Sequence, residues 1–325
     1  MNKITDTNLI NTSSDVTVIM ATYNPVWEKC VFTIDSIIGQ KDTSIELIVV
    51  DDGSSENLFD RFTSYLDDKG FENYKLIDHT NNQGTVKNYY DGLLAASGKY
   101  IKLISPGDAL YNEQTLSKWL DYLKKSGKQW SFGDAVFYSN DKGVKQVVTA
   151  PAYPRMIDCY LSGNNELCRW NYVVLEDFAL GAALLCERSL LIEYLKKFIG
   201  VVKYTEDLVH VAMMYEGILP AYFNCNVIFY EYGTGISTGE DKWKAKVRLD
   251  MKNAELAVAG SSGKDAFQSK LAKAIMHINS GSETGKKIKK YLHRGGMKKL
   301  VKQRFNPRLS SDDCSSCGNW WKSSI

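Results

Sequence analysis

Residues 47–54 read Leu-Ile-Val-Val-Asp-Asp-Gly-Ser, an apolar run that ends in two carboxylates, a glycine and a serine. The run from Ile45 to Val50 is typical of a parallel strand buried on both faces. Open α/β sheets bind their ligands at the carboxyl ends of such strands. We therefore expect Asp51 and Asp52 to face a ligand. The alternative is a simple turn, because Asp, Gly and Ser are common turn residues.

A second run of the same kind, Val16–Ala21, ends in the polar loop Thr22-Tyr23-Asn24-Pro25 and leads into a helical pattern through Ile38. Residues 45–69 repeat this order of strand, loop and helix. Crossover connections between parallel strands are right-handed, so both loops should reach the same edge of one sheet. The sequence therefore predicts an α/β fold with a pocket between two strand ends.

Further segments follow in order along the chain. They are Asn81-Asn82-Gln83-Gly84, then Lys87-Asn88, then Ser97-Gly98-Lys99-Tyr100-Ile101. Together with Thr-Tyr-Asn and Asp-Asp-Gly-Ser, this order resembles the family 2 glycosyltransferases of the GT-A fold over about residues 16–235. The resemblance implies a Rossmann-like mixed sheet flanked by helices, and the transfer of a sugar from a nucleotide-diphosphate donor.

The resemblance also implies that the donor is a UDP-sugar and indicates residues that bind it. It gives Asp52 a contact with the base, because a carboxylate can accept the N3–H of uracil and an unpaired buried donor costs about 1–3 kcal/mol. Tyr23 would lie on or beside the same ring. The other donor contacts implied along these loops are Ala21, Asn24, Asp51, Asn82 and Gly84.

Lys87 stands where members of the family usually carry arginine. An ammonium group cannot reproduce the two-pronged contact of a guanidinium group, but it can still approach phosphate. The alternative is a solvated charge on the helix expected over 84–96, which is the commoner position of a helical lysine. We retain Lys87 as a secondary donor contact.

The segment Tyr100–Asp108 carries the main departure from the family pattern. The family ends this strand in an Asp-x-Asp-Asp cluster, whereas the matching positions here are Ser105, Gly107 and Asp108. Mg²⁺ and Mn²⁺ often take one or two protein carboxylates and complete their shell with substrate phosphates, so Asp108 could hold such an ion alone. Alternatively, Ser105, the Gly107 amide and a helix beginning near Asn112 could bind phosphate without metal.

A base must take the proton of the acceptor hydroxyl as that hydroxyl attacks the anomeric carbon with inversion. The resemblance assigns this role to Asp207 and gives Glu206 the task of orienting the loop or the acceptor. An ordinary aspartate has a pKa of about 4, so it is ionised at pH 7 and needs only correct placement. The alternative is an acidic first helical turn capped by Thr205.

Two other segments bear on the same site. Glu176-Asp177 is a competing acidic pair, ranked lower because it precedes the apolar stretch that begins at Phe178, and it could line the acceptor site. Many members of the family also carry a histidine that completes a metal site, and here Tyr232 takes that position. The tyrosine and the depleted acid cluster both weaken the case for a metal.

Composition fits a globular enzyme. The 325 residues are 44% hydrophobic, enough for a full core, and a net charge of +2 gives no general attraction to polyanions. The longest apolar stretch falls far short of the ~20 residues of a membrane span, and no N-terminal signal pattern is present. The seven cysteines are scattered, which fits buried thiols in a reducing compartment. We therefore expect a cytoplasmic protein.

We expect residues 1–14 to be a flexible tail, 15–238 a GT-A catalytic domain, and 239–325 a helical, basic C-terminal region. Helical patterns cover 241–259 and 265–279 in that last region. Cys314 and Cys317 lack further zinc ligands nearby, so we expect the end of the chain to be frayed.

Between Lys286 and Arg308, basic residues alternate with apolar ones and no acid interrupts them. Such a segment can lie on the anionic inner face of a membrane, which would suit an enzyme that extends a glycan on a lipid carrier. The alternative is a solvated helical face that packs on the catalytic domain. We expect no nucleic-acid partner, because no motif of that kind accompanies the basic residues.

These observations predict an inverting glycosyltransferase that moves a sugar from a nucleotide-diphosphate donor to a hydroxyl. The acceptor would be a glycan, lipid-linked or protein-linked, in the synthesis of bacterial surface polysaccharide or glycoprotein. One alternative is a nucleotide-sugar-binding protein that has lost turnover through the change at Ser105-Pro106-Gly107. Another is a nucleotidyltransferase or NAD-dependent oxidoreductase, against which the first loop lacks G-x-G-x-x-G and P-loop glycines.

Overall fold

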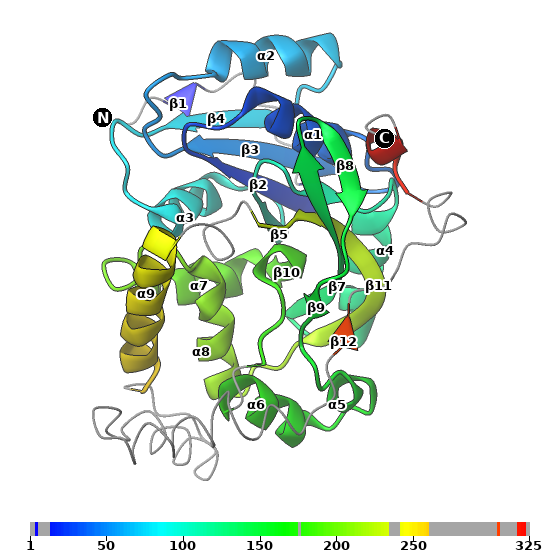
Figure 1. Ribbon diagram of the computed structural model, residues 1–325, viewed down its shortest axis with the longest axis vertical. Helices are drawn as coiled ribbons and strands as arrows, with labels where there is room; N and C mark the ends of the chain where they lie inside the picture. The colour runs from blue at the N-terminus through cyan, green and yellow to red at the C-terminus, as the bar shows by residue number, and fades with distance from the viewer. Residues whose placement is uncertain are drawn as a thin grey trace.

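The computed structural model describes residues 4–5, 14–174, 177–233, 241–259, 304–305 and 317–322. Its centre is a ten-stranded mixed sheet (Figure 1). The strands are β1 (Ile4–Thr5), β2 (Val16–Thr22), β3 (Ile45–Asp51), β4 (Tyr74–Asp78), β5 (Tyr100–Ile104), β6 (Ala109–Leu110), β7 (Trp130–Asp141), β8 (Val144–Val147), β10 (Leu184–Glu187) and β11 (Ala221–Glu231). They lie in the order β1-β4-β3-β2-β5-β10-β7-β11-β6, and β8 pairs with β7.

The part of the sheet formed by β4, β3, β2 and β5 is parallel. All of β3 is buried, as its continuous apolar sequence predicts for a strand covered on both faces. Thr22 pairs with Asp51 in register, so the loops after β2 and β3 leave the sheet side by side. The prediction that two strand-loop-helix units share one edge of a sheet is therefore confirmed.

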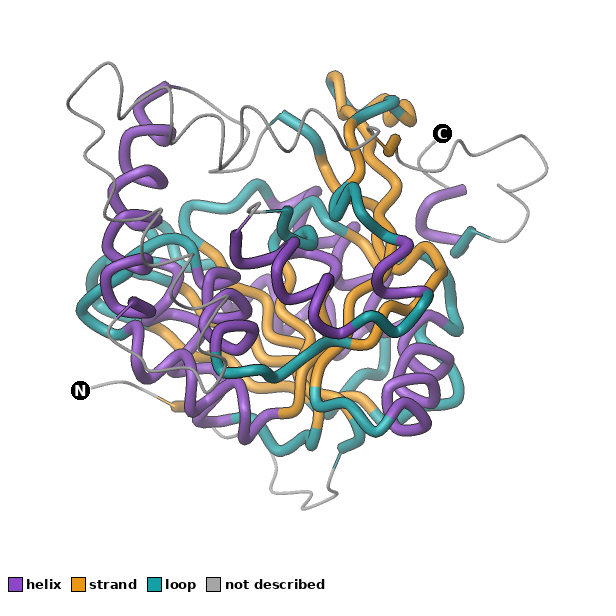
Figure 2. The backbone as a smooth tube through the Cα atoms, turned by 90° about the horizontal axis from the view of Figure 1, so that it is seen from below, coloured by secondary structure: helices purple, strands orange, loops and turns teal. Residues whose placement is uncertain are grey.

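Helices cover both faces of the sheet (Figure 2). Alternate residues of β2 explain the two layers, because successive strand side chains point to opposite faces. Val18 and Met20 pack with α1 (Trp27–Ile38), α2 (Phe59–Asp68) and α4 (Thr115–Ser126). Ile19 packs in the other layer. That layer contains α3 (Thr85–Ala95), α6 (Asn165–Val174), α7 (Arg188–Phe198) and α8 (Val209–Tyr215).

The other part of the sheet carries the long strands β7 and β11, which are parallel to each other. β10 lies between β5 and β7 and is antiparallel to both. β6 pairs antiparallel with β11, with Ala109 opposite Phe229. This pairing brings Asp108 against Glu231, although 123 positions separate them in the chain.

Short elements complete the description. They are α5 (Asp158–Leu161), the 3-10 turns η1 (Gly181–Ala183) and η2 (Glu206–Leu208), β9 (Pro151–Ala152), α9 (Asp241–Ala259), β12 (Arg304–Phe305) and α13 (Asn319–Lys322). The helix expected over 241–259 is confirmed as α9. The expected helix at 265–279 lies outside the described residues. None of the described helices is both long enough and apolar enough to cross a membrane.

Both ends of the chain depart from expectation. Residues 1–14 were expected to be a flexible tail, but Ile4–Thr5 form β1, which pairs with β4. The far C-terminus was expected to be frayed, yet Cys317, Trp320 and Trp321 are buried against α1 and the end of β11. That expectation is wrong for these residues, because two large aromatic rings supply more apolar surface than a solvated tail would leave exposed. Cys314 and most of 286–308 lie outside the described residues.

Candidate functional site

The carboxyl ends of β2, β3 and β5 open into a cleft with a cavity volume of about 480 Å³. Most of the predicted site residues line it: Ala21, Tyr23, Asn24, Asp52, Ser105, Asp108, Glu206 and Asp207. They come from four separate loops, which the fold brings to one rim of the sheet. Asp51, Asn82, Gly84 and Lys87 are not among its lining residues, all of which belong to the described part of the chain.

The two aspartates after β3 have different environments. Asp51 accepts hydrogen bonds from the Thr22 hydroxyl at 2.8 Å and from the Ser54 amide and hydroxyl at 2.7 and 2.6 Å. Its carboxylate therefore ties the first two loops together. Asp52 lines the cleft and accepts the backbone N–H groups of Gln83 and Gly84 at 2.7 and 2.8 Å.

Burial raises the pKa of Asp52, while its two backbone hydrogen bonds oppose the shift. Each carboxylate oxygen has a further lone pair, so Asp52 can still accept a hydrogen bond from a ligand. Tyr23 is 53% exposed at the same end of the cleft, where its ring is free to stack on a planar group. This end can therefore receive a nucleobase.

Helix α3 explains why Lys87 does not enter the cleft. Residues three and four apart share a helix face, and Thr85, Asn88 and Tyr89 form the face that lines the cleft. Lys87 is turned away from that face, and its ammonium group pairs with Asp91. It lines a separate cavity of about 570 Å³.

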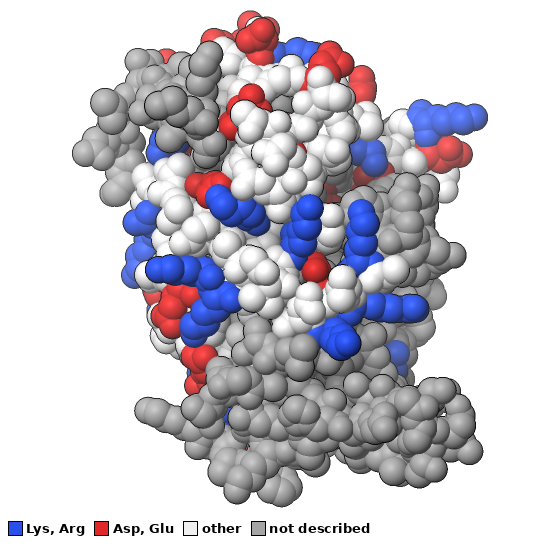
Figure 3. All heavy atoms as spheres, turned by 90° about the vertical axis from the view of Figure 1, so that its left-hand side faces the viewer, with Lys and Arg blue, Asp and Glu red and all other residues white. Residues whose placement is uncertain are grey.

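Lys203, Tyr204, Lys246 and Asp250 also line that second cavity. Basic side chains are prominent across the middle of the molecular face shown in Figure 3. The ammonium groups of Lys203 and Lys246 lie 5.4 and 5.3 Å from the centre of the Tyr204 ring. Tyr204 lines both cavities and so lies between the second cavity and the cleft.

The loop Ser105–Asp108 forms the floor of the cleft beside β5. The Thr33 hydroxyl donates to the Asp108 carbonyl at 2.7 Å and accepts the Gly107 N–H at 3.0 Å. Tyr138 donates to the Gly107 carbonyl. Helix α1 and strand β7 thus hold the loop, while Ser105 remains exposed within the cleft.

Gly107 is required by both conformation and space. Its φ of +101° lies in a region that other residues rarely adopt. A Cβ atom at this position would lie 2.4 Å from Oε2 of Glu231 and 3.5 Å from Cδ of Lys29. The position that lacks an acid therefore makes room for the side chains of Glu231 and Lys29.

Lys29 and Glu231 are cleft residues that the sequence analysis missed. The Lys29 ammonium lies 2.6 Å from Oε2 of Glu231, and the Glu231 side chain is 4% exposed. Two signals were present in the sequence. Lys29 falls in the first turn of a helix, where the helix dipole disfavours a cation, and Glu231 is an acid directly after an apolar run.

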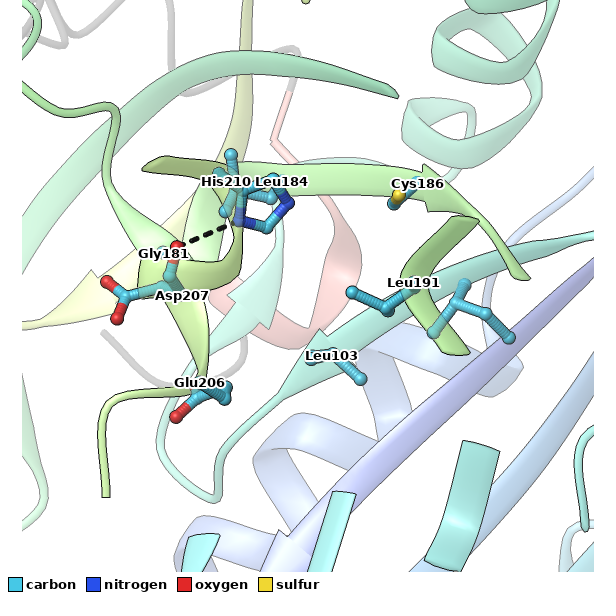
Figure 4. Close-up of a pocket in the computed structure, with 9 residues that line it drawn as sticks. Leu103, Gly181, Leu184, Cys186, Leu191, Glu206, Asp207 and His210 are labelled. Atoms are coloured by element: carbon cyan, nitrogen blue, oxygen red, sulfur yellow. Dashed lines mark hydrogen bonds between the residues drawn. The ribbon is translucent and has the colours of Figure 1, made fainter. Parts of the chain in front are cut away.

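Glu206 and Asp207 line another part of the cleft wall, beside Gly181 of η1. They also line a mostly apolar cavity of about 20 Å³ behind that wall, together with Leu103, Leu191 and His210 (Figure 4). Burial therefore raises the pKa of both carboxyl groups. The pKa of Glu206 rises to about 8, with a further contribution from the charge of Asp207.

Backbone N–H groups at Asp207 and Leu208 favour the charged form of Asp207 and oppose the effect of burial. The raised pKa of Glu206 favours its protonated form at neutral pH. The Asp207 carbonyl lies 3.0 Å from Nδ1 of His210, so this nitrogen is the donor. Burial lowers the pKa of His210 to about 4, so its ring is neutral.

The loop before Asp207 is anchored from outside the cleft by Asp250 of α9. Its carboxylate accepts the backbone N–H of Lys203 at 3.2 Å and the backbone N–H of Tyr204 at 2.5 Å. The Thr205 hydroxyl also approaches it at 3.5 Å. Helix α9 therefore contacts the loop that carries Asp207, although its residues were expected to form an appended region.

The competing acid Asp177 does not line the cleft. Its Oδ2 accepts the backbone N–H groups of Arg155 and Met156 at 2.6 and 3.1 Å and the Asn171 side-chain amide at 3.0 Å. These bonds tie residues 155–156 to Asn171 of α6. Glu176 lies outside the described residues.

The cleft floor is a poor site for a divalent cation of the Mg²⁺ or Mn²⁺ type while no substrate is bound. Such ions can take one or two ionised protein carboxylates and complete their octahedral shell with substrate phosphates, so the floor would have to offer at least one free, ionised carboxylate. Oδ1 of Asp108 accepts the Glu231 N–H at 3.1 Å, and burial raises the pKa of Asp108 to about 7. The nearby Glu231 carboxylate is neutralised by Lys29. Within the described residues, no cluster of three His, Cys, Asp or Glu side chains could hold a metal.

The sequence profile of glycosyl transferase family 2 matches residues 17–181, which is more than half of the chain. The chain belongs to glycosyltransferase family 2. Glycosyl transfer is therefore its class of reaction, and the matched region contains the loops that form one side of the cleft. No curated protein matched the sequence.

Solved structures share the fold at low sequence identity. Staphylococcus aureus TarS, residues 1–349, has a TM-score of 0.54 at 16% identity, over 83% of this chain and 73% of that one. The same TarS fragment in complex with UDP-GlcNAc has a TM-score of 0.55 at 15% identity, with equal coverage. The mannosyltransferase PcManGT from Pyrobaculum calidifontis, in complex with GDP-Man and Mn²⁺, has a TM-score of 0.50 at 15% identity, over 86% of this chain and 84% of that one. The fold is therefore of the GT-A type.

Proposed function

We propose that this family 2 glycosyltransferase acts with inversion and uses a nucleotide-diphosphate hexose, with UDP as the nucleotide. The acceptor is a hydroxyl of a glycan, lipid-linked or protein-linked, in bacterial surface polysaccharide or glycoprotein synthesis. The observation that supports this best is that Asp207 lines the same cleft as the strand-end loops that contain Tyr23 and Asp52. A donor laid across those loops would present its sugar toward Asp207.

In this reaction the acceptor oxygen attacks the anomeric carbon and its proton passes to Asp207. The bond from that carbon to the diphosphate oxygen breaks, and the electron pair leaves with the nucleotide diphosphate. Glu206 remains protonated beside Asp207 and orients the loop, since a second ionised carboxylate there would be unfavourable. Tyr23 stacks on the base, and Asp52 accepts its N–H.

The choice of UDP rests on the resemblance and on the neighbour that was solved with UDP-GlcNAc. The neighbour solved with GDP-Man makes GDP-sugars the natural comparison. We propose that the enzyme works in the cytoplasm, at the inner face of the membrane, where lipid-linked acceptors are extended.

The test is a nucleotide-release assay with UDP-GlcNAc, UDP-glucose, UDP-galactose and GDP-mannose, with and without a fraction of surface glycans and lipid-linked glycans. The wild-type protein should release UDP from one UDP-sugar when the acceptor fraction is present. Asp207→Asn should bind UDP equally well but lose ~10²- to 10⁴-fold in turnover, the usual contribution of a general base. The anomeric configuration of the product, read by NMR, tests inversion.

Two outcomes would contradict the proposal. UDP binding without release in any acceptor fraction would favour the alternative, a nucleotide-sugar-binding protein that has lost turnover. Release from GDP-mannose alone would show that the UDP assignment is wrong while leaving glycosyl transfer intact.

A further inference from the structure

Lys29 carries the one basic side chain among the described residues that line the cleft. Carboxylates dominate the rest of the charged lining: Asp52, Asp108, Glu206, Asp207 and Glu231. A nucleotide diphosphate is itself an anion and gains further charge as the sugar leaves. Some cation must therefore offset that charge, and the two carboxylates of the cleft floor already have partners: Asp108 accepts the Glu231 N–H, and Glu231 pairs with Lys29.

The position of Lys29 suits this task. It starts from the first turn of α1, directly after the loop that carries Tyr23, and its ammonium reaches the floor beside Gly107 and Asp108. The Lys29 side chain is 26% exposed and lines the cleft, whereas its partner Glu231 is 4% exposed. The ammonium group is therefore open to a ligand on one side and held by a buried carboxylate on the other.

The Lys29 ammonium group also has more N–H donors than Glu231 accepts. It carries three N–H groups, and among the described residues Glu231 accepts one of them. Exposed Ser105 belongs to the loop whose Gly107 N–H lies 3.3 Å from the Lys29 carbonyl, so its hydroxyl and the ammonium can donate to one anion. Because Thr33 and Tyr138 hold the loop from behind, these donors are in place before a ligand arrives.

We propose that Lys29 binds the diphosphate of the donor and stabilises the departing nucleotide diphosphate where other enzymes use a divalent cation. This inference rests on the proposed function. The charge that develops on the leaving oxygen is balanced by the ammonium group, and no proton needs to move to it. Glu231 positions Lys29 and moderates its charge while the cleft is empty.

The proposal predicts opposite effects for the two halves of the ion pair. Lys29→Met removes the cation from the diphosphate. Glu231→Gln keeps an oxygen acceptor for the ammonium but removes the competing negative charge. A purely structural ion pair would behave differently, since either change would break it and weaken ligand binding to a similar degree.

The experiment is calorimetric titration of full-length protein with UDP and with uridine, each in EDTA and in Mn²⁺. Wild-type protein should bind UDP in EDTA more tightly than uridine. Lys29→Met should lose ~10- to 100-fold in UDP affinity, the value of one or two charge-assisted hydrogen bonds, while uridine affinity stays unchanged. Lys29→Arg should recover most of the loss, and Glu231→Gln should bind UDP as tightly as wild type or more tightly.

Lys41→Met is the matched control, because Lys41 pairs with Glu113 on the surface away from the cleft. The inference is overturned if Lys29→Met binds UDP as wild type does, or if wild-type protein binds UDP only with Mn²⁺. An equal loss of UDP affinity in Lys29→Met and Glu231→Gln would mean that the ion pair is only a structural contact. Failure of wild-type protein to bind either UDP or GDP under any condition would instead count against the proposed function.

Discussion

At the scale of single residues, close contacts explain why a given position carries a particular residue, which composition alone would not. Gly181 is an example, because a Cβ atom there would lie 2.8 Å from both Cβ and Oδ2 of Asp207. The glycine lets the backbone of η1 form the wall against which the carboxylate rests. Its φ lies outside the left-handed region, so alanine is compatible with the backbone and conflicts only with Asp207.

Gly181→Ala should therefore disturb catalysis rather than folding. The added methyl group displaces the Asp207 carboxylate, and misplacement of a reacting group by about 1 Å can cost ~100-fold in rate. We expect kcat to fall by ~10- to 100-fold while UDP affinity and the melting temperature stay close to wild type. Steady-state kinetics and thermal unfolding measure both, and an unchanged kcat would separate Asp207 from the chemistry.

Glu206→Gln should change how stability depends on pH. The folded-state pKa of Glu206 is raised to about 8 from an ordinary value near 4.5, so the folded protein holds a proton that the unfolded chain releases. Its contribution to stability is complete below about pH 4.5 and is lost as pH rises toward 8. Glutamine resembles the protonated form, so the variant should become more stable relative to wild type across that window.

Urea denaturation of both proteins between pH 5 and pH 9 measures this difference. Turnover at pH 7 should be largely retained in Glu206→Gln, because Asp207 is intact and its neighbour stays uncharged. A loss as large as that of Asp207→Asn would identify Glu206 as the base instead.

At the scale of elements, the contact that helix α9 makes with residues 203–205 is the one that the sequence indicated least. Its helical pattern over 241–259 is plain, but nothing in that pattern shows that Asp250 would reach back to residues 203–205. The contact depends on how α9 packs against α7 and α8. Lys87 is a second example. Its motif position predicted a contact with the donor phosphate, but its place on α3 directs the side chain away from the cleft, where it pairs with Asp91.

Asp250→Ala should weaken catalysis through the loop that carries Asp207. Without the carboxylate, the N–H groups of Lys203 and Tyr204 lose their acceptor and the loop gains freedom. We expect kcat to fall by about tenfold or more, with little change in UDP affinity. Asn253→Ala is the matched control, because Asn253 lies one turn along α9 and its side chain contacts the Val201 carbonyl instead. Equal kinetics in both variants would show that the Asp250 contact has no part in catalysis.

At the scale of the whole molecule, the features that could be predicted from the sequence are local ones. The buried parallel strands, the loops after them and the helix over 241–259 follow from apolar runs and periodicity, and the GT-A fold was expected from ordered motifs. The pair Lys29–Glu231 could not be foreseen, because 202 positions separate the two residues and only the closing of β11 onto β6 brings them together. The same closing places Asp108 beside a second carboxylate that no linear motif contains.

Substitution of the C-terminal aromatic residues tests whether the end of the chain stabilises the core beside β6 and β11. The ring of Trp321 stacks on Phe229 at a centroid distance of 4.0 Å, and Trp320 donates to the Leu110 carbonyl at 2.9 Å. Because Trp321 is 1% exposed, Trp321→Ala should lower the free energy of unfolding by about 3–5 kcal/mol. Leu94→Ala, at a position 54% exposed, should change it little.

Chemical denaturation of the two variants gives this comparison directly. β6 and the end of β11 form the floor that carries Asp108 and Glu231, so Trp321→Ala should also weaken UDP binding before the protein unfolds. Stability equal to wild type would mean that the aromatic pair contributes nothing to the core, as a frayed tail would. A large loss of stability without any loss of UDP affinity would show that the floor of the cleft holds its shape independently of the C-terminus.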